Sequence, residues 1–201
     1  MNAEEVLRHF EETEALLSGH FRLSSGLHSD KYLQCAKVLQ WPERASALGA
    51  ALGDALAALG VDVVLSPAMG GLVIGHEVGR ALGRRAVFAE RVDGAFTLRR
   101  GFGLEPGEKV VVVEDVVTTG GSTREVLALV KSLGAVAVAC AAVVDRRAAS
   151  AGGGSGTLEG LPFRSVLRME VPTWEEAACP YCRLGQDVVS PGSRRLSSAK
   201  A

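Results

Sequence analysis

The chain has 201 residues, of which 47% are hydrophobic, and this is enough for one domain with a full core and a modest appendage. Its 22 basic and 23 acidic residues leave a formal net charge of -1, so no broad field attracts nucleic acid or an anionic membrane. No apolar run approaches the ~20 residues of a membrane span, and the first residues contain neither a basic nor an apolar leader region. We therefore expect a cytoplasmic protein that holds small substrates locally, with no nucleic-acid or membrane partner.

Helical and extended patterns alternate along most of the chain, which predicts an α/β fold with a parallel sheet between helices. Asn2 can cap the first helix, whose intermittent apolar face comprises Val6, Leu7, Phe10, Leu16 and Leu17. Pro42 suits the first turn of the next helix, and Gly60, Gly83 and Gly134 suit helix ends. The remaining expected elements are an extended segment over 23–39, helices over 42–59, 71–82 and 123–133, strands over 61–66, 86–90, 110–113 and 135–144, a mobile loop over 150–156 and an edge strand over 163–171.

The segment 109–123 carries the strongest functional pattern. It begins with a β-branched run over 110–113, which is typical of a parallel strand buried on both faces, and ligands bind at the carboxyl ends of such strands. Glu114 and Asp115 follow directly, and two carboxylates can accept hydrogen bonds from the two hydroxyls of a ribose. The loop after them supplies hydroxyls, free backbone N–H groups and the positive end of a helix, which suits a phosphate. This loop comprises Val116, Val117, Thr118, Thr119, Gly120, Gly121, Ser122 and Thr123.

A plain strand-to-helix connection is the alternative, because either half of this pattern also occurs without a ligand. The loop is not a P-loop, since no Gly-Lys-Ser/Thr ends it, and it is not a Gly-x-Gly-x-x-Gly dinucleotide turn. The strand, the acidic pair, the loop and the helix nevertheless occur in the order that a sugar-phosphate site requires. We therefore favour a site for a phosphorylated sugar.

The segment 109–123 resembles the phosphoribosyl pyrophosphate (PRPP) signature of the type I phosphoribosyltransferases. The resemblance implies their α/β fold, in which helices flank a central, mainly parallel sheet that carries a small N-terminal hood and a flexible lid hairpin. It also implies a single domain over 1–201, with the hood in about 1–40 plus the C-terminal segment, the core in about 41–171 and a disordered tail in about 194–201. Mg²⁺ is the implied cofactor, and it is expected to arrive with PRPP rather than on an identified protein ligand.

A second strand-to-helix loop is expected at the same edge of the sheet. Its glycines allow a close backbone approach to an anion, and in phosphoribosyltransferases a loop in this place cradles pyrophosphate. An ordinary turn is the alternative. The loop comprises Ala68, Met69, Gly70 and Gly71.

Residues 90–104 interrupt the alternation with a long insertion that carries Arg91, Arg99 and Arg100. Loops of this length in compact domains are commonly lids or binding loops, and a guanidinium fork suits pyrophosphate. Arg91 is the best candidate because it leaves the strand end directly. A solvated hairpin is the alternative.

Two further segments indicate the acceptor. Residues 19–32 are similar to the N-terminal Phe-x-Leu-x-Ser-Gly stretch of the orotate phosphoribosyltransferases, and residues 143–146 are similar to their strand end with an arginine for the orotate carboxylate. This similarity spans about residues 15–150 and implies transfer of the 5-phosphoribosyl group from PRPP to orotate in UMP biosynthesis, by a homodimer with shared active sites. The implied orotate contacts are Thr118, Arg146, Ser25, Lys31 and Tyr32, and the implied catalytic residues are Asp115, Glu114 and Arg91.

This chain departs from the family pattern at several places. Many members have a lysine where it has Ser24 or Gly70, and its lid contains arginines in place of Lys-x-x-Lys-x-His. A purine (adenine or xanthine) phosphoribosyltransferase would share the PRPP signature but would need no arginine for a carboxylate. A non-catalytic PRPP-sensing regulator would need a basic face or a helix-turn-helix extension, and neither is visible in the sequence.

Four cysteines are too few for a disulfide framework in a chain of this size. Cys140 lies in an apolar run and is expected in the core. Cys179 and Cys182 have the spacing of metal ligands and resemble the Cys-Pro-x-Cys tail of orotate enzymes from thermophilic bacteria and some archaea. A four-ligand zinc site needs two more ligands, and we expect no second ligand pair in this chain. Zinc at these two residues and reduced structural thiols both stay open.

Overall fold

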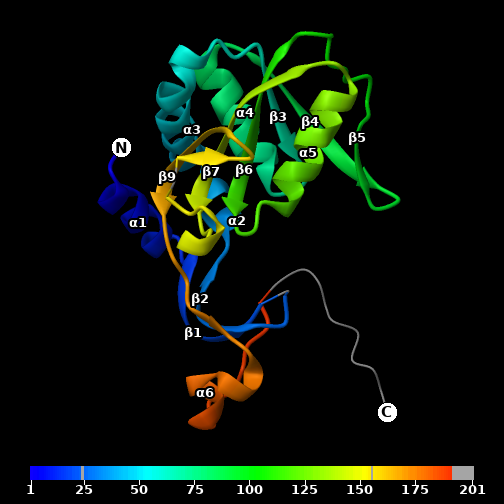
Figure 1. The fold of residues 1–201 in the computed structure, drawn as a ribbon. Helices are drawn as coiled ribbons and strands as arrows, with labels where there is room; N and C mark the ends of the chain where they lie inside the picture. Colours follow the sequence, from blue (N-terminus) through cyan, green and yellow to red (C-terminus); the bar gives the residue numbers. More distant parts are fainter. Residues whose placement is uncertain (24, 155, 192–201) are drawn as a thin grey trace.

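The structure is a computed structural model that describes residues 1–23, 25–154 and 156–191. Its centre is a seven-stranded sheet with the order β5-β4-β3-β6-β7-β9-β8 (Figure 1). The five inner strands are parallel, whereas β5 and β8 pair antiparallel at the two edges. The strands are β3 (Val63–Pro67), β4 (Arg85–Val92), β5 (Ala95–Leu98), β6 (Lys109–Val117), β7 (Val136–Asp145), β8 (Thr157–Leu158) and β9 (Leu161–Arg168). The predicted α/β architecture with a mainly parallel sheet is confirmed.

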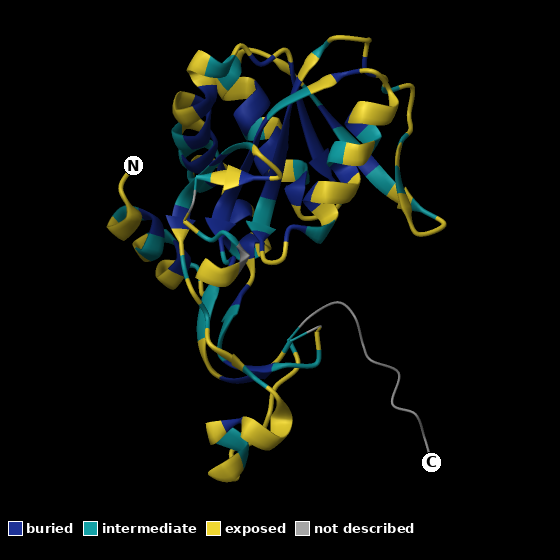
Figure 2. Cartoon of the chain, in the orientation of Figure 1, coloured by how far each residue is buried: buried dark blue, intermediate teal, exposed yellow. Residues whose placement is uncertain are grey.

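Helices cover both faces of this sheet, and strand β6 shows why. Val111 and Val113 pack in one core cluster with α1 to α4, whereas Val110 and Val112 pack in the other with α5. All four valines are fully buried, as a strand between two layers requires (Figure 2). The helices of the central unit are α1 (Ala3–Glu12), α2 (Cys35–Leu39), α3 (Pro42–Leu56), α4 (Gly71–Leu82) and α5 (Gly121–Ser132), with short 3-10 turns η1 (Ala57–Leu59) and η2 (Ala149–Ala151).

A smaller antiparallel sheet pairs segments from the N-terminal and C-terminal parts of the chain beyond the carboxyl edge of the central sheet. It has the order β1-β2-β10, formed by β1 (Leu16–Arg22), β2 (His28–Leu33) and β10 (Thr173–Trp174). The segment that follows contains η3 (Glu176–Ala178) and α6 (Pro180–Arg183), which lies at the end of the molecule farthest from the central sheet (Figure 1). The hairpin of β1 and β2 therefore stands between the core and α6.

Several local predictions are confirmed. Asn2 caps α1 in a capping box with Glu5, and α4 occupies the predicted residues. Gly60 and Gly83 end their helices with φ values of 64° and 63°, in the left-handed region that glycine tolerates best. The expected lid is the β4-β5 hairpin, which turns at Asp93 and Gly94.

Three local predictions are wrong. Leu16 and Leu17 belong to β1, because α1 ends at Thr13 and the chain turns at Glu14, whose φ is 51°. The segment 23–39 is not extended throughout, because the buried Cys35, Val38 and Leu39 have helical spacing and form one face of α2. The segment predicted as an edge strand forms β9, which is not at the edge of the sheet because β8 pairs along its outer side.

Two predictions concern residues outside the described ranges. The tail expected over 194–201 lies there, as does Ser24. The loop over 150–156 is described except for residue 155, and Gly154 N–H donates a hydrogen bond to Asp145 Oδ2 over 3.4 Å. Among the described helices, not one has the length and apolarity that a membrane crossing requires.

Candidate active site

The predicted functional segments meet at one edge of the central sheet. Strands β3, β4, β6 and β7 are parallel neighbours, so their carboxyl ends lie on the same side. The loop 68–71 follows β3, Arg91 is near the end of β4, the loop 118–120 follows β6, and Arg146 follows β7. This edge is the place where open α/β sheets bind ligands, and it faces the β1-β2 hairpin (Figure 1).

Glu114 lies at the inner end of this site. Its side chain is buried, and Glu114 Oε1 accepts a hydrogen bond of 3.1 Å from the Thr123 hydroxyl on the first turn of α5. Burial raises the pKa of Glu114 to about 7, an effect that the Thr123 hydrogen bond opposes and the neighbouring Asp115 charge reinforces. Glu114 is therefore a carboxyl group whose ionisation changes near neutral pH.

Asp115 lies directly against the loop after β3. A Cβ atom on Gly70 would stand 2.7 and 2.8 Å from the two carboxylate oxygens of Asp115, so a larger residue there would require this carboxylate to shift. Burial raises the pKa of Asp115, while hydrogen bonds from backbone N–H groups, including Val116 N–H at 2.9 Å, oppose the shift. Gly70 therefore lets the loop after β3 lie directly against the Asp115 carboxylate.

The backbone of the loop 68–71 is fixed, yet its tip is open. Ala68 N–H donates to the Ala89 carbonyl over 2.8 Å, which ties the loop to β4. The peptide between Ala68 and Met69 is cis, and Met69 is 78% exposed. A Cβ on Gly71 would stand 3.0 Å from both Ser66 Cβ and the Val113 carbonyl, so this glycine permits close packing on β3 and β6.

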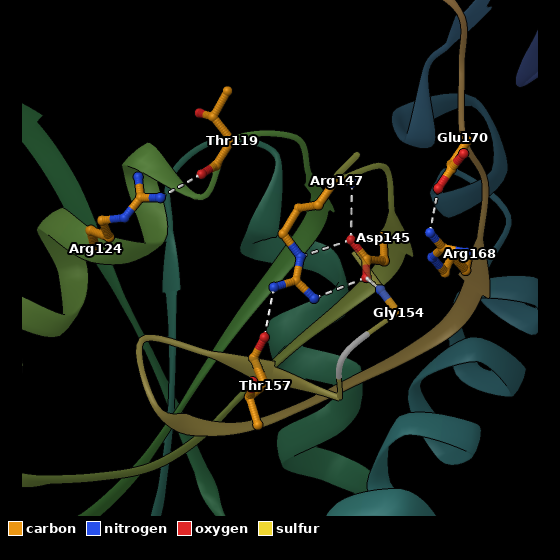
Figure 3. A network of polar contacts seen from close by, with 8 residues as sticks. All are labelled: Thr119, Arg124, Asp145, Arg147, Gly154, Thr157, Arg168 and Glu170. Atoms are coloured by element: carbon orange, nitrogen blue, oxygen red, sulfur yellow. Dashed lines mark hydrogen bonds and ion pairs between the residues drawn. The ribbon is translucent and has the colours of Figure 1, made fainter. Parts of the chain in front are cut away.

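The loop after β6 presents hydroxyls and the start of α5. Thr118 and Thr119 are exposed, and Gly120, whose φ is 77°, caps the helix. Arg124 Nη2 donates to the Thr119 carbonyl over 2.8 Å and thereby holds the loop (Figure 3). The first N–H groups of a helix have no partner within the helix, so this end of α5 can bind an anion.

Two adjacent arginines after β7 have different environments. Arg147 is fully buried and forms a two-pronged ion pair with Asp145, with both N···O distances at 2.9 Å (Figure 3). It also donates to the Thr157 carbonyl over 2.7 Å and lies over the Phe163 ring. Burial alone would raise the pKa of Asp145, but the hydrogen bonds from Arg147 outweigh it and the pKa is lowered. Arg147 is thus fully engaged inside the protein.

Arg146 has no comparable partner. Its Nε is buried without a hydrogen-bond partner among the residues that the structure describes. Burial lowers the pKa of Arg146, and the nearby Cys35 and Tyr32 oppose that shift. A buried guanidinium nitrogen without a partner is costly, so this side chain is poised to bind an anionic group.

Cys35 is a site neighbour that the sequence interpretation missed. It begins α2, and its Sγ lies 3.6 Å from the Asp115 carbonyl. Burial raises the pKa of Cys35 well above its usual value, and Asp115 adds to the shift, so the thiol stays protonated. A single buried cysteine in an apolar stretch carries no sequence signal that would have separated it from an ordinary core residue.

The structure brings only some of the remaining predicted site residues close to one another. Arg91 lies at the expected strand end, but it pairs with Glu125 on α5 at 2.8 Å, bonds the Gly94 carbonyl and stacks over the Phe96 ring. Tyr32 interacts electrostatically with Arg146. Ser25 lies in the exposed turn of the β1-β2 hairpin, and within the described part of the chain no hydrogen bond or ion pair links Ser25 or Lys31 to Glu114 or Asp115.

Comparison with known proteins defines the class first. The phosphoribosyl transferase domain family matches residues 35–151, which include the acidic pair and the loops after β3 and β6. An orotate phosphoribosyltransferase from Caldanaerobacter subterraneus is 46% identical over 98% of this chain and its own full length. One from Acidithiobacillus ferrooxidans is 49% identical over the same shares of the two chains. The chain therefore belongs to the orotate phosphoribosyltransferase family.

A solved structure agrees with this assignment. The orotate phosphoribosyltransferase from Aeropyrum pernix has 26% sequence identity to this chain and a TM-score of 0.64. The match covers 82% of this chain and 93% of that one. The shared fold therefore extends beyond the matched domain.

Proposed function

We propose that the protein transfers the 5-phosphoribosyl group of PRPP to orotate, giving orotidine 5'-monophosphate and pyrophosphate. The observation that carries the choice of acceptor is Arg146, whose buried Nε has no hydrogen-bond partner among the described residues. Its neighbour Arg147 is fully paired with Asp145, so the two arginines are not equivalent. A carboxylated base would supply the missing partner of Arg146.

The donor half of the site follows from β6 and its loop. Glu114 and Asp115 would accept hydrogen bonds from the ribose hydroxyls, and the loop 117–123 would hold the 5'-phosphate at the start of α5. The open loop over Ala68–Gly71 would lie along the pyrophosphate. Arg91 would reach the leaving group only by exchanging its present partner, Glu125.

Mg²⁺ fits this site because the available donors are carboxylate oxygens, which hard divalent cations prefer. When bound with PRPP, Mg²⁺ would supply positive charge that offsets the negative charge of the departing pyrophosphate. The chain itself buries Glu114, and the two carboxylates would orient the ribose, with the charge of Asp115 stabilising the positive charge that develops on it. Orotate can already lose its ring proton, so the reaction needs little base catalysis from the protein.

Three further properties belong to the same proposal. A homodimer that shares its active sites is supported by the exposed β4-β5 hairpin and the projecting β1-β2 hairpin (Figure 2). A cytoplasmic location suits an enzyme of nucleotide biosynthesis. Membership of a subgroup with a Cys-Pro-x-Cys tail is supported by Cys179 and Cys182.

A purine phosphoribosyltransferase is the second candidate, and Arg146 argues against it. Adenine has no carboxylate, so it would leave the guanidinium of Arg146 buried without an anionic partner. A regulator that only senses PRPP would not need Arg146 either. The direct test is loss of orotate absorbance after addition of PRPP and Mg²⁺, with adenine, xanthine and uracil as controls. Consumption of orotate alone supports the proposal, and consumption of adenine or xanthine in its place contradicts it.

The raised pKa of Glu114 predicts a pH-dependent affinity for PRPP. Ribose hydroxyls and Mg²⁺ favour the ionised carboxylate, and the free protein holds a proton on Glu114 below a pKa of about 7. PRPP binding should therefore weaken as pH falls below 7, by up to about tenfold per pH unit from this group. Calorimetric titration of PRPP and Mg²⁺ between pH 5.5 and 8 measures this slope.

A matched variant isolates the contribution of Glu114, because the phosphates of PRPP also titrate in this range, with a pKa of roughly 6. The side chain of Glu114→Gln cannot ionise, so the dependence of its PRPP affinity on pH should be shallower than that of the wild-type protein. Identical binding slopes for both proteins would refute the assignment.

The free energy of unfolding of the free protein should show the opposite trend. Because the pKa of Glu114 is raised in the folded protein, this free energy should fall as pH rises from about 4.5 to 7.

A further inference from the structure

Four potential metal ligands converge beyond the active site, between the β1-β2 hairpin and the C-terminal segment. They are His20 on β1, His28 at the start of β2, Cys179 just before α6, and Cys182 within α6. One ligand atom from each residue lies within 4.8 Å of all the others. His20, His28 and Cys179 are buried, and Cys182 is half-buried. The expectation that Cys179 and Cys182 lack a second ligand pair is therefore wrong, because the second pair is two histidines.

The spacing of these atoms matches a tetrahedral site. A zinc ion with Zn–N bonds of about 2.0–2.1 Å and Zn–S bonds of about 2.3 Å has N···S edges of about 3.6 Å. The distances from His20 Nε2 to the two sulfurs are 3.5 Å for Cys179 and 3.6 Å for Cys182. His28 Nδ1 lies 3.2 Å from the Cys182 sulfur and 2.8 Å from His20 Nε2, so both edges are shorter than the ideal N···S edge and the ideal N···N edge of about 3.3 Å. The four atoms need only small shifts to surround one ion.

The outer contact of His20 fixes the ring for this role. His20 Nδ1 lies 2.9 Å from the Gln186 carbonyl, and a carbonyl can only accept a hydrogen bond. The proton of the neutral ring therefore sits on Nδ1, which leaves the Nε2 lone pair directed at the cluster. Metal-bound histidines commonly have this arrangement, in which the second ring nitrogen donates to a carbonyl.

The C-terminal segment also needs a tie of this kind. Its helix α6 has four residues and its strand β10 has two, and among its residues up to 191 only Cys179 is in the buried core. Leu184 is 72% exposed, and Val189 is 54% exposed. The other ties include backbone hydrogen bonds, such as those between Val189 and the β1 residues His20 and Arg22, and the stacking of Tyr181 on His20. Segments without a core of their own commonly depend on a metal or a disulfide.

We propose that His20, His28, Cys179 and Cys182 bind one structural Zn²⁺ that fastens the C-terminal segment to the β1-β2 hairpin. Two thiolates and two imidazoles in a tetrahedral arrangement are a donor set that selects zinc. All four ligands come from one chain, so no ligand from a second subunit is required. With four protein ligands the ion has no open position, and its role is therefore structural.

Metal content tests the proposal directly. Protein purified under reducing conditions from zinc-containing medium should contain about one zinc per chain by mass spectrometry of the metal. His28→Ala and Cys182→Ser should each contain less than about 0.1 zinc per chain. The matched controls are His76→Ala, which removes an exposed histidine of α4, and Cys140→Ala, which removes a core thiol; both should retain the zinc.

A second measurement follows the fold of the segment and does not depend on the variants. Arg183 in α6 is exposed and offers a trypsin site. Removal of zinc from the wild-type protein with a strong chelator should speed cleavage after Arg183 by at least about tenfold, and added Zn²⁺ should restore protection. Co²⁺ in place of Zn²⁺ should give the visible bands of a tetrahedral site with thiolate ligands.

Three results would overturn the proposal. They are wild-type protein without zinc but with four free thiols, wild-type protein with a disulfide between Cys179 and Cys182, and zinc that persists in His28→Ala. These outcomes leave the proposed transferase reaction untouched, because orotate consumption is measured separately.

Discussion

Asp115→Asn is expected to lower turnover by up to about a thousandfold while changing the affinity for PRPP far less. Positive charge develops on the ribose as pyrophosphate leaves, and Asp115 is the carboxylate nearest to the loop that would hold pyrophosphate. A carboxylate ~4 Å from this cation contributes at most about 4 kcal/mol at an effective dielectric constant of ~20. That energy corresponds to roughly a thousandfold in rate. Asparagine keeps the size and most hydrogen-bonding capacity of the side chain, but it loses the charge.

Steady-state kinetics with separate titrations of PRPP and orotate measure this effect. Asp54→Asn is the matched control, because Asp54 is exposed on α3 and faces no part of the site. The control should keep wild-type turnover. If Asp115→Asn turned over at a near-normal rate, or if its defect were confined to PRPP binding, Asp115 would have no role in stabilising the cation.

Arg147→Ala should lower the free energy of unfolding by about 3–5 kcal/mol, which is the usual cost of leaving one partner of a buried ion pair alone. Asp145 and Arg147 are 2% and 1% exposed, so water cannot replace the lost contact. The alanine would also leave the Thr157 carbonyl without the Arg147 donor and remove the packing on Phe163. Urea-induced unfolding followed by circular dichroism measures the change.

Two variants sharpen this test. Arg146→Ala removes the neighbouring guanidinium, which has an unsatisfied nitrogen, so it should change stability by less than about 1 kcal/mol. The double variant Asp145→Ala, Arg147→Ala should be more stable than Arg147→Ala, because it leaves no lone buried charge. A loss below about 1 kcal/mol for Arg147→Ala would contradict the structural role of the pair.

Local sequence was enough to predict the central part of the fold and the position of the acidic pair at the sheet edge. The β-branched run of β6 requires burial on both faces, and Glu114 and Asp115 follow it directly, so their place at the sheet edge depends on few distant residues. The helix α4 is bounded by a glycine loop and by Gly83, and both are readable from the sequence. Leu16 and Leu17 were misassigned because their pairing partners, Leu33 and Tyr32, lie on the other strand of the hairpin.

Contacts between distant segments were not predictable in the same way. His20 and Cys179 are 159 residues apart, and only the return of the chain past β10 brings them together. The partner of Arg91 depends on the orientation of α5, which its own sequence does not specify. The contrast between Arg146 and Arg147 depends on which of two adjacent side chains points toward Asp145, and sequence similarity alone cannot show that Arg147 is the buried one.

The most direct test of orotate recognition is the kinetic comparison of orotate with uracil, which lacks the carboxylate, in the wild-type protein and in Arg146→Ala. A charge-assisted hydrogen bond to a buried group is worth about 1.5–3 kcal/mol, or roughly 10- to 150-fold. The wild-type protein should therefore prefer orotate by at least that factor. Arg146→Ala should lose the preference through a raised KM for orotate, with the KM for PRPP within about twofold of wild type. Equal effects of Arg146→Ala on PRPP and orotate, or a preference for orotate that survives the substitution, would contradict the proposed acceptor site.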